Sequence, residues 1–294
     1  MRNQLKTIVL MGALSAVVVG FGALVAPGHL YLFGAIALAM NLGAYFFSDR
    51  LVLRMHNAQP VTRDEAPVLH AMVDELSERA GIPKPRVFLI PDPQPNAFAT
   101  GRNPKHGVIA VTEGILRLLD RRELRGVIAH ELAHIKNRDI LISSIAAAGA
   151  ALISYAAQAL SFGALFGASN NDEEEQSGGF LAALVAPLAA TLIQLGISRS
   201  REYLADETGA RIAGDPEALA SALWKLEQGA ALIPAQAPAA TASLFIVNPF
   251  QGLQSVARWF ATHPSTEERV HRLQQMVARQ VRPTTRRYAH ARGW

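Results

Sequence analysis

The hydrophobic residues of the chain gather into four long stretches separated by polar segments. The first stretch, residues 7–26, contains no charged residue, and the second, residues 30–47, begins after only the three residues Pro27-Gly28-His29. About 20 residues at ~1.5 Å each suffice for a helix to cross the ~30 Å hydrocarbon layer of a membrane. A cleaved signal peptide would not explain a second apolar stretch so close behind the first. The pattern therefore predicts a helical hairpin that spans a membrane.

The third and fourth stretches, residues 140–168 and 180–197, leave two interpretations open. They flank an acidic loop at residues 170–175, as the two arms of a second membrane hairpin would. They are also rich in Ala and Gly and contain glutamines and a proline, which is compatible with helices buried in a protein core. Lys and Arg are absent from the acidic loop and from the turn at Pro27 but are common in the other polar segments. By the positive-inside rule, those basic segments face the cytoplasm.

The polar segments predict a small sheet followed by a helix. Residues 64–79 carry apolar side chains at helical spacing, whereas residues 86–90 and 107–111 are typical of strands on either side of a proline-rich turn. Asp120 with Glu123 three residues later resembles a capping box, just before another apolar run. A helix is therefore expected to begin at this position.

Together these patterns predict a mainly α-helical fold with a small β-sheet, in which multi-pass membrane helices are joined to a cytoplasmic domain. The Ala- and Pro-rich segment at residues 234–242 predicts a loop or lid. The expected divisions are a transmembrane hairpin at residues 1–54, a cytoplasmic part at 55–139, a second hydrophobic hairpin at 140–197 and a further cytoplasmic part at 198–294.

Composition narrows the possible chemistry. Hydrophobic residues make up 50% of the 294 positions, which is high for a soluble enzyme and low for a protein made only of membrane helices. The chain has no Cys, so a bound metal would have to be held by His, Asp or Glu. Its net charge of +4 comes without any basic stretch interleaved with aromatic residues, and no nucleic-acid partner is expected.

The predicted helix after Asp120 carries the sequence His130-Glu131-Leu132-Ala133-His134. Imidazoles four residues apart project from one face of a helix, so both can bind a single Zn²⁺ ion. Glu131 would lie beside the metal and could take a proton from the attacking water and deliver it to the leaving amine. Since surface helices also contain this pattern by chance, a further ligand is needed to make the case.

Glu202, just after the fourth apolar stretch, is the expected third protein ligand. Asp206 lies one helical turn further on and could accept a hydrogen bond from a ligand imidazole. The alternative is that both carboxylates lie on a solvated face and pair with Arg199 and Arg201. If the third and fourth stretches form a hairpin, its ends bring Glu202 close to His134.

Several segments together resemble the bacterial HtpX heat-shock peptidases. They are the extended motif at residues 130–139, residues 201–206, residues 96–101 and Thr262-His263-Pro264, and the likeness covers almost the whole chain. This resemblance implies a gluzincin, or zincin-like, metalloprotease domain related to the CAAX prenyl proteases, with one Zn²⁺ per chain. It also implies a multi-pass protein of the bacterial inner membrane whose active site faces the cytoplasm. The implied function is cleavage of unfolded or damaged membrane proteins in quality control and the stress response.

The resemblance further implies roles for individual residues. It implies that His130, His134 and Glu202 are the zinc ligands and that Glu131 is catalytic. Asn96, Ala97 and Phe98 look like the edge strand to which an extended substrate adds by main-chain hydrogen bonds. A plain edge strand that binds no substrate is the alternative. His263 could stabilise the developing oxyanion, or it could simply precede a helix that starts near Ser265.

Two other functions remain open. A site-specific processing peptidase for a membrane-associated peptide would cut at one position instead of many. A non-catalytic, zinc-stabilised membrane scaffold would keep its function after Glu131→Gln, because Glu131 is not needed to hold the metal. A closed structural zinc site usually has a fourth protein ligand, and the sequence offers none nearby.

Overall fold

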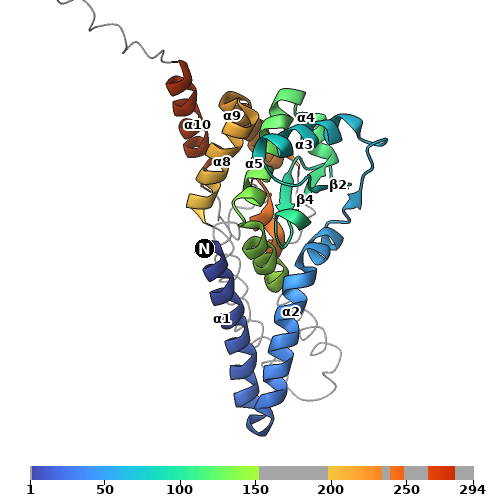
Figure 1. Ribbon diagram of the computed structural model, residues 1–294, viewed down its shortest axis with the longest axis vertical. Coiled ribbons are helices and arrows are strands. Elements are labelled where there is room, and N and C mark those ends of the chain that lie inside the picture. Colours follow the sequence, from blue (N-terminus) through green and yellow to red (C-terminus); the bar gives the residue numbers. More distant parts are fainter. Residues whose placement is uncertain (1, 152–197, 234–238, 248–263, 282–294) are drawn as a thin grey trace, which may run out of the picture.

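The computed structural model describes residues 2–151, 198–233, 239–247 and 264–281. Two parts are apparent in Figure 1, a helical hairpin below and a compact α/β part above it. The described residues are mainly helical with one small mixed sheet, as expected from the sequence. Beyond residue 151, the third and fourth apolar stretches lie outside the described residues.

The hairpin consists of α1 (Arg2–Val25) and α2 (Leu30–Met55), joined by the short 3-10 helix η1 (Pro27–His29). α2 continues eight residues past the apolar stretch at residues 30–47 and so carries the chain directly into the α/β part. The two helices are joined by a polar contact, because Asn41 Nδ2 donates to Ser15 Oγ at 2.6 Å. The helical hairpin expected from the sequence is thus present.

Among the described residues, one helical segment, Pro27–Met55, is long and apolar enough to cross a membrane by length and composition. Only 6% of its most apolar 18-residue stretch is buried within the protein. The helix Ile140–Ala151, which begins the third apolar stretch, is shorter, and most of its side chains are buried against α1 and α2.

The α/β part contains one four-stranded sheet among its described residues. It contains β1 (Gln59–Pro60), β2 (Arg86–Ile90), β3 (Ala97–Thr100) and β4 (Val108–Thr112) in the order β1-β2-β4-β3. β2 and β4 run parallel, whereas β1 and β3 are antiparallel to their neighbours. β3 is therefore an edge strand of the sheet.

α5 (Arg121–Lys136) is the central helix of the α/β part and contacts α3 (Pro67–Ala80), α8 (Arg199–Ala213) and α9 (Pro216–Leu232). The other helical segments of this part are η2 (Pro104–His106), α4 (Glu113–Leu118), η3 (Ala239–Leu244) and α10 (Thr266–Val281). The expected capping box is complete, because Asp120 accepts from the Glu123 backbone and Glu123 accepts from the Asp120 backbone. α5 is buried along most of its length among α3, α8, α9 and β3. A helix in this position can hold side chains rigidly in the protein interior.

Two sequence expectations need adjustment. The first helix after the hairpin begins at Pro67 instead of residue 64, because proline fits the first turn of a helix, where no backbone donor is needed. The expected loop at residues 234–242 is in part a 3-10 helix, η3. Thr241 and Ala242 are buried, so this part of the segment belongs to the core; residues 234–238 lie outside the described residues.

Candidate active site

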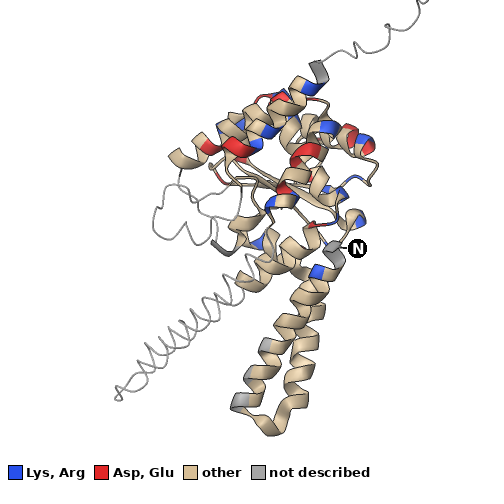
Figure 2. Ribbon diagram, turned by 90° about the vertical axis from the view of Figure 1, so that its left-hand side faces the viewer, with Lys and Arg blue, Asp and Glu red and all other residues tan. Residues whose placement is uncertain are grey.

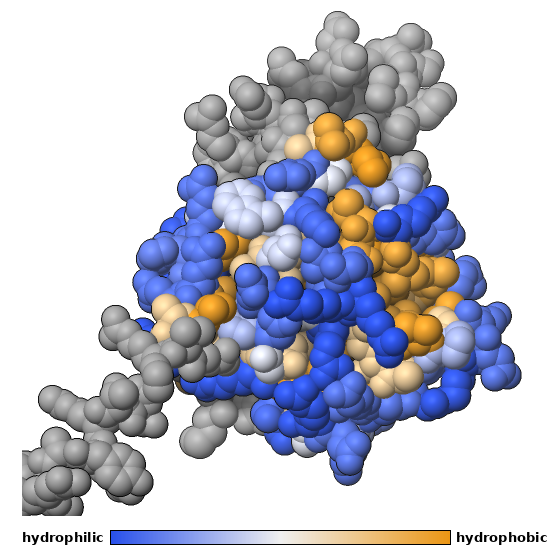
Figure 3. Space-filling view, turned by 90° about the horizontal axis from the view of Figure 1, so that it is seen from above, coloured by the Kyte–Doolittle hydropathy of each residue, from blue (hydrophilic) through white to orange (hydrophobic). Residues whose placement is uncertain are grey.

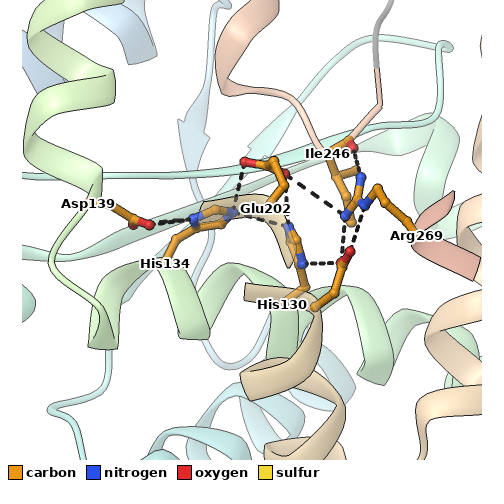
Figure 4. A network of polar contacts seen from close by, with 7 residues as sticks. His130, His134, Asp139, Glu202, Ile246 and Arg269 are labelled. Carbon is orange, nitrogen blue, oxygen red and sulfur yellow. Dashed lines mark hydrogen bonds and ion pairs between the residues drawn. The ribbon is translucent and has the colours of Figure 1, made fainter. Parts of the chain in front are cut away.

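The predicted metal ligands lie on two helices that cross at very close range. His130 and His134 project from one face of α5, and Glu202 comes from the first turn of α8 (Figure 4). The close approach depends on Gly209, because a Cβ atom there would lie 2.7 Å from the Cα of His130. Any larger residue at this position would push α8, and with it Glu202, away from α5.

The ligand atoms of these three residues point at a common centre. Nε2 of His130 and Nε2 of His134 are 3.1 Å apart. The Glu202 carboxylate places one oxygen 3.8 Å from the first nitrogen and the other 3.7 Å from the second. Ligand atoms bound tetrahedrally at ~2.0–2.2 Å from zinc are separated by roughly 3.4 Å. The spacing therefore fits a small tetrahedral ion such as zinc.

The chemistry of these donors also fits a metal ion. Among the described residues, the group that could hold a metal ion consists of two imidazoles and a carboxylate. The ligand atoms of these three side chains all lie within 4.8 Å of one another. His130 is fully buried and the Glu202 side chain is 11% exposed, so little water reaches them to satisfy these atoms. Three such donors would leave a fourth position of a tetrahedral ion open, as in catalytic zinc sites.

Behind His130, buried charges hold the imidazole in place. Nδ1 of His130 lies 2.9 Å from Oδ1 of Asp206. Arg269 on α10 donates to both oxygens of Asp206, at 2.8 and 2.7 Å. Burial by itself raises the pKa of Asp206, but Arg269 outweighs burial and the pKa falls to about 2. Asp206 thus stays charged and fixes the orientation of His130.

His134 is paired with a different carboxylate from that of His130. Its Nδ1 lies 3.1 Å from a carboxylate oxygen of Asp139, which follows the end of α5. Burial lowers the pKa of His134, but the carboxylates of Asp139 and Glu202 outweigh it and raise the pKa to about 10. The His134 side chain is 17% exposed, so this side of the site is accessible from outside.

Glu131 is placed between the metal group and the sheet. Its side chain is buried, and burial in a poorly hydrated position raises its pKa to about 7. The backbone N–H of Ala99 in β3 donates to its carboxylate and partly offsets that increase. A carboxyl group with a pKa near 7 can both accept and release a proton at neutral pH.

The edge of β3 is covered by another segment of the chain. The Ile246 backbone N–H donates to Ala97 O at 3.1 Å, and the Asn96 side chain donates to Val247 O at 3.1 Å. Ile246 O in turn accepts from Arg269 at 2.7 Å (Figure 4). Residues 96–98, expected as an open edge for substrate, are thus buried and already hydrogen-bonded at Ala97.

Two residues that shape the site were not among those expected from the sequence, and one expected residue is not described. Asp139 reaches His134 because Arg138 has φ 57°, a left-handed conformation that turns the chain back after α5. Arg269 is 67 residues from Glu202 in the chain, and its spacing gave no signal. His263 lies outside the described residues, so its expected role stays a prediction.

Comparison with known proteins identifies the class of the molecule. A family model described as peptidase family M48 matches residues 63–277. A protease HtpX homolog of Pelotomaculum thermopropionicum is 54% identical over 280 residues, which make up 94% of this chain and 99% of that protein. Protease HtpX homologs of Pyrococcus furiosus and Ralstonia pickettii are 52% and 50% identical, covering 92% and 94% of this chain and 95% and 98% of theirs.

Among solved structures, the crystal structure of S. mikatae Ste24p superposes with a TM-score of 0.49 at 18% identity, over 92% of this chain and 65% of that chain. The sequence matches and the buried His-His-Glu group define a metalloprotease. More particularly, the chain belongs to peptidase family M48.

Proposed function

We propose that the chain is a zinc-dependent endopeptidase that cleaves misfolded or damaged membrane proteins at the cytoplasmic face of the bacterial inner membrane. The observation that carries the proposal is the convergence of His130, His134 and Glu202 beside the buried carboxyl group of Glu131. Zinc suits two imidazoles and a carboxylate in tetrahedral geometry, and one ion per chain fits the group.

When bound there, zinc would polarise the scissile carbonyl and make water more acidic. Glu131 then accepts a proton from the attacking water as the new C–O bond forms. When the C–N bond breaks, Glu131 delivers the same proton to the leaving amine. Because Glu131 is held by Ala99 and shielded from solvent, it keeps a fixed position during both transfers.

His263 is proposed to stabilise the negative charge that develops on the carbonyl oxygen. The test is His263→Ala, which should lower the turnover number while the zinc content stays full. Loss of zinc together with activity would instead indicate a structural role for this residue.

The substrate is proposed to bind as an extended strand along β3, with Asn96, Ala97 and Phe98 as its contacts. Ala97 O can accept from a substrate only when the bond from Ile246 has opened. Ile246→Pro removes that N–H donor, and it should raise kcat/KM for casein a few-fold at unchanged zinc content. Ile246→Val keeps the donor and should behave like wild type. An unchanged or lower kcat/KM in the proline variant would argue against this edge as the binding site.

The membrane placement rests on the hairpin. Residues 1–54 are proposed to span the membrane and residues 140–197 to form a second hydrophobic hairpin. Charged residues are concentrated in the α/β part, while the hairpin is almost free of them (Figure 2). Residues 55–139 and 198–294 are proposed to be the two cytoplasmic catalytic parts. Large apolar side chains are exposed along the hairpin, among them Leu5, Ile8, Val9, Tyr31, Leu38 and Phe47. Burying them in lipid would remove this apolar surface from water.

The opposite end of the molecule has a different surface. Seen from above, hydrophilic residues cover most of the α/β part, with apolar side chains grouped toward one side (Figure 3). That surface suits contact with water, as expected if the α/β part lies in the cytoplasm. Unfolded segments of membrane proteins would then meet the site close to the lipid surface.

The deciding experiment measures cleavage of casein by detergent-purified protein, together with its zinc content. Glu131→Gln should retain zinc and lose cleavage, because it cannot accept the proton of the attacking water. Glu207→Gln is the matched control, since Glu207 is a partly exposed glutamate on α8 that pairs with Arg211. A chelator should stop cleavage by wild type.

Three outcomes would contradict the proposal. Cleavage by zinc-loaded Glu131→Gln would rule out Glu131 as the general base. Zinc-loaded wild type that cuts no unfolded protein would favour the scaffold. A single cut at one fixed position would favour a processing peptidase.

A further inference from the structure

The hairpin and the helix Ile140–Ala151 enclose a cavity that the peptidase reaction does not use. Its volume is about 570 Å³, within the range of roughly 300–1,000 Å³ typical of ligand sites. Most of the side chains that line it are apolar, and many are small: Ala37, Gly43, Ala44, Ala148 and Gly149. α1 and α2 diverge from their turn toward the α/β part (Figure 1). The helix Ile140–Ala151 packs against both of them, and residues of all three helices line the cavity.

The cavity extends along α2 from Ala37 to Arg54, a distance of ~25 Å at ~1.5 Å per residue. This length suits one acyl chain lying parallel to the helix. Two uncharged polar side chains, Asn41 and Ser48, line the cavity between its ends. Asn41 already donates to Ser15 Oγ and to Met11 O, and Ser48 is buried. The middle of the cavity is therefore fitted to hydrocarbon.

One end of the cavity is strongly basic. Arg50 and Arg54 line it, both are exposed, and their spacing of four residues puts them on the same face of α2. Within the described part of the chain, neither arginine forms an ion pair with a carboxylate. Asp49, the nearest acidic residue in sequence, is already paired with Arg86 at 3.1 Å. Like charges at this spacing destabilise a helix unless an anion lies between them.

We propose that this cavity binds an anionic glycerophospholipid, with one acyl chain between the helices and the phosphate held by Arg50 and Arg54. Guanidinium groups bind phosphate through paired charge-assisted hydrogen bonds. Basic pockets between helices at the cytoplasmic side of a membrane are suited to anionic headgroups. The bound lipid would fill the gap between the hairpin and Ile140–Ala151, and so join the membrane part to the chain segment that follows α5. The inference rests on the proposed membrane embedding of the hairpin.

The test is lipid binding to the delipidated full chain in a non-ionic detergent, followed by native mass spectrometry. Wild type should bind phosphatidylglycerol about 25-fold more tightly than phosphatidylcholine, at about fivefold for each arginine. Arg50→Gln with Arg54→Gln should remove this preference. Arg102→Gln is the matched control. Arg102 lies outside α2 but stacks on Phe46 of that helix, and it does not line the cavity.

A second variant tests the acyl-chain part of the site. Gly43→Leu adds a side chain where a Cβ atom meets no other atom within 4 Å, so folding should be retained. Filling the cavity should weaken binding of both lipids, with zinc content and melting temperature unchanged. Inorganic phosphate at equal concentration should not displace phosphatidylglycerol.

Equal binding of the two lipids by wild type would overturn the proposal, as would displacement by phosphate alone. So would an unchanged preference in the double arginine variant. Alkaline carbonate extraction of lipid vesicles that contain the chain distinguishes failure of the lipid-site proposal from failure of the membrane proposal. A chain that stays in the vesicles but shows no lipid preference lacks only the lipid site. A chain that is released from the vesicles is not embedded in the membrane.

Discussion

The two imidazoles of the site lie in contrasting surroundings. His130 is fully buried, and behind it Asp206 and Arg269 form a closed network of charges. His134 is partly exposed, and its partner Asp139 belongs to the turn that follows α5. The buried side is built from three helices, whereas the exposed side depends on one helix and the turn next to it. The first is therefore expected to contribute mainly to the stability of the fold, and the second mainly to the affinity for metal.

The largest effect on stability is expected from Asp206→Asn. The substitution leaves the guanidinium of Arg269, which is 1% exposed, with the Ile246 carbonyl as a neutral acceptor and the Glu202 carboxylate, 4.0 Å away, as its remaining ion-pair partner. Removing one partner of a buried ion pair costs about 3–5 kcal/mol. The melting temperature in detergent should therefore fall sharply. A melting temperature equal to that of wild type would contradict the stabilising role of the buried side.

The sharpest contrast is expected from Asp139→Asn on the exposed side. Loss of a carboxylate that orients a ligand imidazole lowers metal affinity by about 10–100-fold. Asp139 is itself buried, but it faces one partly exposed imidazole and not a buried guanidinium, so the melting temperature of the metal-free protein should fall less than in the Asp206 variant. Chelator competition measures the zinc affinity. Equal losses of stability in the Asp139 and Asp206 variants would remove the distinction between the two sides.

A substitution at the helix crossing tests the geometry that joins the two sides. Gly209→Ala places a methyl group against the backbone of His130, at 2.7 Å from its Cα. Overpacking of this kind costs about 1–3 kcal/mol and should shift Glu202 away from the imidazoles. Zinc affinity and melting temperature should fall together. Gly43→Ala, at an open position in α2, serves as the control.

The smallest effect is expected at the beginning of α5, away from the metal group. Glu123 is buried and accepts from Lys225 at 2.7 Å. Burial raises the pKa of Glu123, but Lys225 and Ser221 outweigh it, so the folded-state pKa lies below its usual value. This contribution to stability is present above the unfolded pKa of about 4.3 and is lost as the pH falls through the lower folded value.

Glu123→Gln should therefore cost about 1.5 kcal/mol at pH 7 and much less at acid pH. Unfolding of both proteins in denaturant at several pH values measures the difference. Glu113→Gln, which affects only an exposed pair with Arg117, should cost less than about 0.5 kcal/mol at either pH. A cost of Glu123→Gln that stays constant with pH would show that the carboxylate charge is not what stabilises this contact.

The local parts of this architecture could be predicted from the sequence because they depend on neighbours in the chain. The capping box at Asp120 and the spacing of His130 and His134 define the start and the functional face of α5. Glu202 was recognised from its place after the fourth apolar stretch. The structure brings its carboxylate to the two imidazoles, but its role as ligand stays a proposal.

Features that depend on distant contacts could not be predicted in this way. Nothing local to Gly209 indicates that α5 will lie against it, and nothing in the spacing of Arg269 indicates that it will meet Asp206. The same holds for the edge of β3. A strand sequence shows which side chains alternate, but it does not show that Ile246 will cover one edge.

X-ray absorption at the zinc edge of the purified chain tests most directly whether His130, His134 and Glu202 hold one zinc ion. We expect four-coordinate zinc with two imidazole nitrogens and oxygen ligands at about 2.0–2.2 Å. His134→Ala should remove one of the two imidazole contributions. A spectrum with six oxygen ligands and no imidazole, or one that His134→Ala leaves unchanged, would contradict the account.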